Sequence, residues 1–233
     1  MKLIDQLFDR MDAWRHLPNY QLERRADLFF SLYLPRVLEA KLGFPVRTAL
    51  VPELPVRIGT IYPRIPINKS FKIDYLALST DGAEAVFVEL KTEESSRRPK
   101  QDSYLAAARD VGLVRLLEGL LDIFGATSAK RKYFCLFERL AGMDLLEIPV
   151  AFREIMTRPN LQGANEASRS IRVTARVTRH RIVYVQPNGS GDDIVSFHDF
   201  RAIVEQYDDP VSQRFAKSLA EWACVQAGRT AST

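Results

Sequence analysis

The clearest helical pattern of apolar residues lies between residues 21 and 42. Ala26, Phe30 and Tyr33 recur there at spacings of four and three, which places them on one face of a helix. Gly43 follows, and glycine is a typical residue just past the end of a helix. The pattern therefore predicts a helix over residues 21–42.

Apolar runs and turn residues predict further elements along the rest of the chain. The proline-rich stretch 45–70 predicts a loop with one strand at residues 56–61. The remaining expected elements are a hairpin at 71–92, one long helix at 99–124, a strand at 133–137, a short helix at 149–156, a strand pair at 171–186, and helices at 197–207 and 211–226. This order predicts one α/β domain over residues 1–226, with a central mixed sheet flanked by helices and a frayed tail at 227–233.

The dipeptide Asp81-Gly82 lies between two runs of β-prone residues and is a strong hairpin signal. A two-residue turn places Thr80 opposite Ala83. Counting back along both strands then places Asp74 opposite Glu89, on one face of the sheet. Both faces of the hairpin are otherwise apolar, so we expect it to be central in the sheet.

Two facing carboxylates on neighbouring strands have Cβ atoms about 4.5–5.5 Å apart and repel each other. A hard divalent cation between Asp74 and Glu89 relieves that repulsion, because all the ligands on offer are oxygens. Lys91, two residues beyond Glu89, lies on the same face. The alternative is a plain ion pair between Glu89 and Lys91, with Asp74 solvated at the end of its strand.

Composition narrows the chemistry further. The 233 residues carry 33 Lys and Arg against 29 Asp and Glu, a net charge of +4 that permits a polyanionic partner. Cys135 and Cys224 are far apart and the three histidines are scattered, which excludes a disulfide framework and a cysteine-based zinc site. Acidic residues interrupt the N-terminal stretch, and no apolar run approaches the roughly 20 residues of a membrane span. We therefore expect a cytoplasmic protein with no membrane partner.

Asp74 followed on the next strand by Glu89-Leu90-Lys91 resembles the core motif of the PD-(D/E)xK nuclease superfamily. The resemblance covers residues 21–137 and includes the preceding helix, the long helix and the short strand that frame the hairpin. Ile73 stands where the motif name has proline.

The resemblance implies a restriction-endonuclease-like core over residues 21–137, with a C-terminal extension at 150–226. It also implies a nuclease that hydrolyses phosphodiester bonds in DNA with Mg²⁺ or Mn²⁺. Asp74, Glu89 and the backbone carbonyl of Leu90 are then metal ligands, and Lys91 stabilises charge on the attacking water or the phosphate.

Further residues resemble accessories of the same superfamily. Gln101 and Tyr104 form Gln-x-x-Tyr, where many RecB-like members have Gln-x-x-x-Tyr; alternatively, Tyr104 is a core residue and Gln101 a surface residue. Glu39 resembles an acid that the first helix contributes, and it shares a helical lane with Leu28 and Leu32, so we expect it to point inward. Glu23 on the same helix is the alternative.

Basic residues indicate where a polyanion lies. Arg97, Arg98 and Lys100 belong to a polar loop that follows the proposed lysine. Arg172 and Arg176 alternate with apolar residues in a stretch, 169–181, that contains no acid, and such spacing suits successive phosphates. The alternative is an edge strand protected from aggregation by its charge.

Three functions stay open on this evidence. The first is a metal-dependent deoxyribonuclease. The second is a nucleic-acid-binding domain of the same fold that has lost catalysis, and the third is a protein-interaction domain. A homodimer would be needed for a double-strand cut with one site in each subunit.

Overall fold

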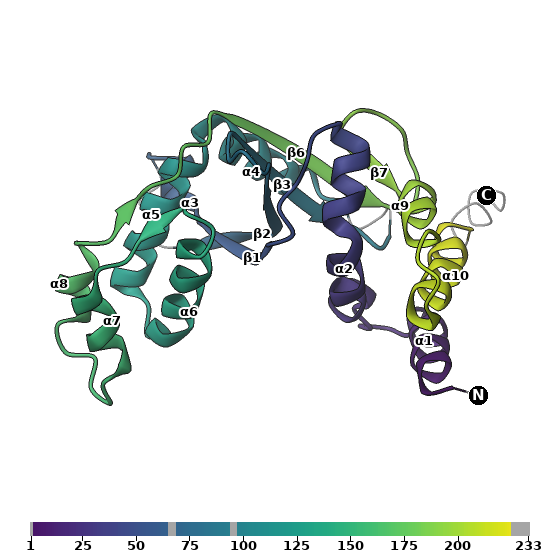
Figure 1. The fold of residues 1–233 in the computed structure, drawn as a ribbon, viewed down its shortest axis with the longest axis horizontal. Helices are drawn as coiled ribbons and strands as arrows, with labels where there is room; N and C mark the ends of the chain where they lie inside the picture. Colours follow the sequence, from purple (N-terminus) through teal and green to yellow (C-terminus); the bar gives the residue numbers. More distant parts are fainter. Residues whose placement is uncertain (1, 65–68, 94–96, 225–233) are drawn as a thin grey trace. The chain divides into compact units, whose positions relative to one another are not determined.

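The computed structural model describes residues 2–64, 69–93 and 97–224 (Figure 1). The chain divides into two compact units, each built from separate stretches of sequence. Unit 1 is drawn from Met1–Thr48, Val88–Pro99 and Val183–Thr233, and unit 2 from Ala49–Phe87 and Lys100–Ile182. The tail predicted at 227–233 lies outside the described residues.

Unit 1 is built around four helices: α1 (Leu3–Trp14), α2 (Leu22–Leu42), α9 (Phe197–Val204) and α10 (Pro210–Cys224). Figure 1 shows α1 beside α10, and these two helices are in direct contact. Their shared core is aromatic and fully buried; it contains Phe8, Phe30, Phe197, Phe200, Phe215 and Trp222. Large rings supply much of the apolar area that holds four short helices together.

The helix predicted from the 21–42 pattern is confirmed. α2 ends at Leu42, and Gly43 has a φ of 74°, a left-handed conformation that glycine adopts without steric cost. The helices predicted near the C-terminus are confirmed as α9 and α10, and the short helix expected at 149–156 is α7 (Val150–Thr157).

One five-stranded sheet has the order β1-β2-β3-β6-β7. Its strands are β1 (Val51–Arg57), β2 (Ser70–Leu78), β3 (Glu84–Leu90), β6 (Arg179–Gln186) and β7 (Ile194–Ser196). β1 pairs antiparallel with β2, whereas β6 pairs parallel with β7, so the mixed sheet flanked by helices is confirmed. All seven residues of β3 are buried, as expected for the central strand of the sheet.

The other elements of unit 2 are α3 (Ile58–Ile61), α4 (Pro99–Val111), α5 (Leu113–Ala126), α6 (Lys130–Ala141), β4 (Leu146–Glu147), α7, α8 (Ala164–Ser168) and β5 (Arg172–Val173). Pro99, the first residue of α4, is assigned to unit 1. Phe124, Phe137 and Phe152 pack against one another in its core. β4 and β5 form a separate two-stranded antiparallel sheet.

Two predicted elements break at places that the apolar pattern does not mark. The long helix expected at 99–124 is in fact α4 and α5, divided at Gly112, whose φ of 83° ends one helix before the next begins. The strand expected at 56–61 lies earlier, as β1, because residues 58–61 turn into the short helix α3.

Two further predictions are wrong. The strand expected at 133–137 is part of α6, which buries Phe137 and Leu140 at helical spacing. Residues 171–186 do contain two strands, but they do not pair with each other. β5 pairs with β4, while β6 belongs to the large sheet.

No helix in the described parts of the chain combines the length and the apolarity needed to cross a membrane.

Candidate active site

The end of β3 carries a buried ion pair. The Glu89 side chain is 0% exposed and Lys91, just past the end of the strand, is also buried. The Lys91 ammonium donates to the Glu89 carboxylate. The backbone N–H of Lys91 also donates to the carbonyl of Val185 on β6, at 2.8 Å, which fixes the chain at this point. A buried charge is costly without a counter-charge, so this pair is held in one place.

A second acid approaches the same lysine from the start of α2. The carboxylate of Glu23 lies 3.9 Å from the Lys91 ammonium, and its side chain is 33% exposed. Lys91 therefore lies between a buried and a partly exposed carboxylate. This acid–lysine–acid group belongs entirely to unit 1.

The other acid considered on this helix, Glu39, serves the end of α2 instead. Its carboxylate accepts from Arg36, at 2.7 Å, and from the backbone N–H of Val46, at 3.1 Å. Leu28 and Leu32, which share its helical lane, are exposed, so the expectation that this lane faces inward is wrong. The structure places Glu23, and not Glu39, beside Lys91.

The turn between β2 and β3 keeps the predicted register with a longer loop. The backbone N–H of Ser79 donates to the carbonyl of Glu84, at 3.0 Å, so these two residues face each other as predicted. The N–H of Gly82 donates to the carbonyl of Ser79, which closes the turn inside a four-residue loop. Asp81 accepts from the Ser79 hydroxyl and the Ala83 N–H, and these hydrogen bonds lower the pKa of its carboxyl group.

Asp74 lies on β2, the strand next to β3 in the sheet. On the other side of β2, the register pairs Pro52 with Tyr75 and Leu54 with Ile73, which places Glu53 opposite Asp74. Glu53 has a φ of 52°, an uncommon conformation for a residue with a side chain, and it forms an ion pair with Lys72. Sequence reasoning missed Glu53 because it placed the strand that carries it several residues too late.

Gln101 and Tyr104 lie in the first half of α4, and both are half-buried. The Tyr104 ring packs against Phe71 and Tyr62, with ring centroids 5.2 Å and 5.8 Å away. The Lys100 ammonium lies 5.7 Å from the centre of the same ring. Tyr104 is therefore part of a half-buried aromatic cluster in unit 2.

The basic loop after Lys91 is described in part, since residues 94–96 lie outside the described residues. Arg97 stacks on Tyr184 of β6, with its guanidinium carbon 4.0 Å from the ring centre. Arg98 and Lys100 are exposed. Stacking holds the plane of the Arg97 guanidinium against the Tyr184 ring.

The alternation predicted for residues 171–178 is confirmed in exposure, although only β5 is a strand there. The expectation that no acid offsets the arginines is wrong, because acids outside the stretch pair with four of the five, and Arg169 is paired with Glu166 at 3.5 Å. Glu147 binds Arg172 at 2.6 Å, and Glu84 binds both Arg179 and Arg181. Arg176 is exposed and has no ion pair among the described residues.

The described residues contain no group of three or more His, Cys, Asp or Glu side chains arranged to hold a metal ion. The donor set predicted from the sequence is smaller, with the two carboxylates of Asp74 and Glu89 and the carbonyl of Leu90. These are the hard oxygen donors that Mg²⁺ takes, usually with several waters retained.

Comparisons with protein-family models, with curated proteins and with solved structures find no match to this chain. The resemblance to the PD-(D/E)xK nucleases therefore rests on Asp74 and Glu89-Leu90-Lys91 and on the helix before the hairpin, because the strand expected at 133–137 is part of α6 and the long helix is divided at Gly112.

Proposed function

We propose that the chain is a metal-dependent nuclease that hydrolyses phosphodiester bonds in DNA, with its active site at the end of β3. The observation that carries the proposal is the position of Lys91, buried against Glu89 and 3.9 Å from Glu23. A lysine fixed between two acids at the end of a central strand is suited to act on a reacting water or phosphate.

The hairpin register supports the second part of the site. If the pairing of Ser79 with Glu84 continues along both strands without a bulge, it brings residue 74 opposite residue 89. Asp74, Glu89 and the Leu90 carbonyl would then hold a Mg²⁺ or Mn²⁺ ion. When bound, such an ion supplies a Lewis acid for the phosphate and a water of lowered pKa.

The chain's own groups have distinct tasks in this mechanism. Glu89 fixes the Lys91 ammonium, so that its charge is ordered before the substrate arrives and does not need to reorganise. Lys91 donates hydrogen bonds to the attacking water and to the phosphate oxygen on which negative charge develops. Glu23, which is partly exposed, attracts the Lys91 ammonium from 3.9 Å and draws it toward the substrate side.

The test is cleavage of plasmid and linear DNA with Mg²⁺ or Mn²⁺, compared with EDTA. Wild type should cleave only with the metal, and Lys91→Met should lose about 100-fold or more of the rate. Glu23→Gln should also slow cleavage, whereas Glu39→Gln, the matched control on the same helix, should keep wild-type turnover per folded molecule. DNA binding without cleavage by wild type would favour the catalytically inactive domain, and neither activity would favour the protein-interaction domain.

A further inference from the structure

The last residue of α1, Trp14, has an exposed ring. Its relative exposure is 46%, whereas the other tryptophan of the chain, Trp222, is 0% exposed. A large aromatic ring in contact with water loses the benefit of burial, so a ring held there is available to a partner.

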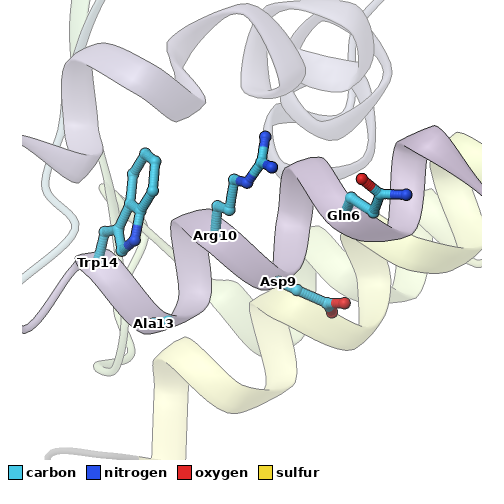
Figure 2. Close-up of a pocket in the computed structure, with 5 residues that line it drawn as sticks. All are labelled: Gln6, Asp9, Arg10, Ala13 and Trp14. Carbon is cyan, nitrogen blue, oxygen red and sulfur yellow. The ribbon is translucent and has the colours of Figure 1, made fainter. Parts of the chain in front are cut away.

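Trp14 forms one wall of a surface hollow of about 220 Å³ on α1, which Gln6, Asp9, Arg10 and Ala13 also line. Figure 2 shows the Trp14 ring and the Arg10 side chain rising from the same side of the helix, one turn apart, with Ala13 below them. The small side chain of Ala13 leaves the space between these two groups open. A flat ring that enters this space meets an aromatic face and a guanidinium group, both of which stack well.

The hollow lies close along the chain to the acid–lysine–acid group. The Tyr20 ring meets the Trp14 ring edge-on, at a centroid distance of 6.2 Å. Tyr20 precedes Glu23 by three residues, so their Cα atoms are at most about 11 Å apart. Burial lowers the pKa of Arg15, the residue after Trp14, while attraction to Glu93, two residues past Lys91, opposes that shift.

Basic residues on the wall of the hollow and a short distance after it in the sequence favour an anionic partner. Asp9, the only acid among the lining residues, is paired with Arg214 at 2.7 Å, a guanidinium that it shares with Asp12. Arg10, on the wall, and Arg24 and Arg25, which follow Glu23, are exposed, and none of the three has an ion pair within the described parts of the chain. This set of charges suits a phosphate backbone whose bases enter the hollow.

We propose that the Trp14–Arg10 hollow binds an unpaired nucleobase of a DNA strand that passes the active site. The inference rests on the proposed nuclease function and narrows it to substrates with a single-stranded or frayed segment. Stacking of a base on an aromatic side chain is tolerant of sequence, because every base has a π face, and the arginines track the backbone.

The experiment measures the affinity of a labelled oligothymidylate by fluorescence anisotropy in EDTA, so that no cleavage takes place. Trp14→Leu should weaken binding about 5- to 150-fold, the range for loss of one stacked base. Trp14→Phe should lose less, since it keeps an aromatic face. Leu32→Ala, the control, removes a more exposed apolar side chain from α2 and should bind like wild type. Thermal unfolding midpoints confirm that each variant is folded.

Trp fluorescence gives an independent readout, because Trp222 is buried and Trp14 is the exposed emitter. Oligothymidylate should quench wild type, and a blunt duplex should quench it much less. Equal affinity of wild type and Trp14→Leu for oligothymidylate would overturn the inference. It would also be overturned if Trp14→Leu abolished self-association of the protein and left its DNA affinity unchanged. Trp14-dependent binding without metal-dependent cleavage would refute the nuclease function and leave the base site standing.

Discussion

Protonation of His180 should destabilise the fold at mildly acidic pH. The Nε2 atom of His180 accepts the backbone N–H of Leu113, the first residue of α5, at 2.9 Å. Burial lowers the pKa of His180 below its ordinary value of 6.5. The acceptor is needed there, because the first N–H groups of a helix have no partner within the helix.

The size of the effect follows from two contributions. A protonated ring carries hydrogen on both nitrogens and cannot accept, so the N–H of Leu113 loses its partner, at a cost of about 1 kcal/mol. The new positive charge would also face the positive end of the α5 dipole. Above pH 6.5 the ring is neutral in both states and contributes nothing to the pH dependence. As pH falls below 6.5, the unfolded chain takes up a proton that the folded chain resists, and stability falls by at most about 1.4 kcal/mol per pH unit.

The assay is urea unfolding at pH 7.5, 6.5 and 5.5 for wild type and His180→Gln. Glutamine keeps a side-chain acceptor but does not titrate in this range. Wild type should lose about 1 kcal/mol more than His180→Gln between pH 7.5 and pH 5.5. His198→Gln, which changes an exposed histidine on α9, should show the wild-type pH dependence. An identical loss of stability in wild type and His180→Gln would refute the assignment of this acid sensitivity to His180.

Three further changes test the packing and the charges described above. Gly119→Ala should lower the free energy of unfolding by about 1–3 kcal/mol, because the added Cβ would lie 2.0 Å from the Thr60 hydroxyl oxygen. A Cβ at Gly125, in the same helix, would meet open space, so Gly125→Ala should leave the thermal unfolding midpoint unchanged or raise it. Arg214→Ala should lower the free energy of unfolding by about 3 kcal/mol, because its side chain is 10% exposed and pairs with both Asp9 and Asp12. Arg201→Ala breaks a half-exposed pair with Glu205 and should lower it by less than about 1 kcal/mol. Similar losses of stability in the two variants would contradict the role of burial. Arg176→Ala should reduce the log–log salt dependence of duplex DNA binding by about 0.9, and Arg172→Ala by less because Glu147 already neutralises it; an unchanged slope for Arg176→Ala would mark a solvated charge.

The parts of the fold that sequence predicts well have short-range signals. The hairpin register follows from Asp81-Gly82 and from the alternation on both sides of it, and the helix α2 follows from its apolar period and Gly43. In each case one local pattern and one turn residue agree.

The predictions that failed depend on partners far away in sequence. Residues 133–137 are continuously apolar, and such a short run has no period that separates a strand from a buried helix. Gly112 lies in register with the buried positions of the expected long helix. The helix is divided at Gly112 because His180, from another part of the chain, accepts a hydrogen bond from the N–H of Leu113 and packs against Gly112.

In the candidate site too, contacts that are local in sequence are predictable and contacts between distant segments are not. The pairing of Glu89 with Lys91 is visible as a local i, i+2 relation on one strand. The choice of Glu23 over Glu39 is not, because it depends on which face of α2 meets β3 rather than on helical spacing alone. The neutralisation of Arg172 by Glu147 likewise requires the pairing of β5 with β4, which neither strand predicts by itself.

The contact between α1 and α10 joins parts of the chain that are synthesised at very different times. Asp12 of α1 accepts from the Arg214 guanidinium and from the indole N–H of Trp222, so this charged group finds these partners 202 and 210 residues later in the chain. Unit 2 contains no residue beyond Ile182, so we expect most of it to fold before α10 is synthesised. Proteolysis of stalled nascent chains should find unit 2 protected before α10 emerges and unit 1 only afterwards. The surroundings of the lysine at the end of β3, which include the carbonyl of Val185 on β6, would then be complete only after that strand is made, which would keep the proposed DNA-cleaving activity latent until that point.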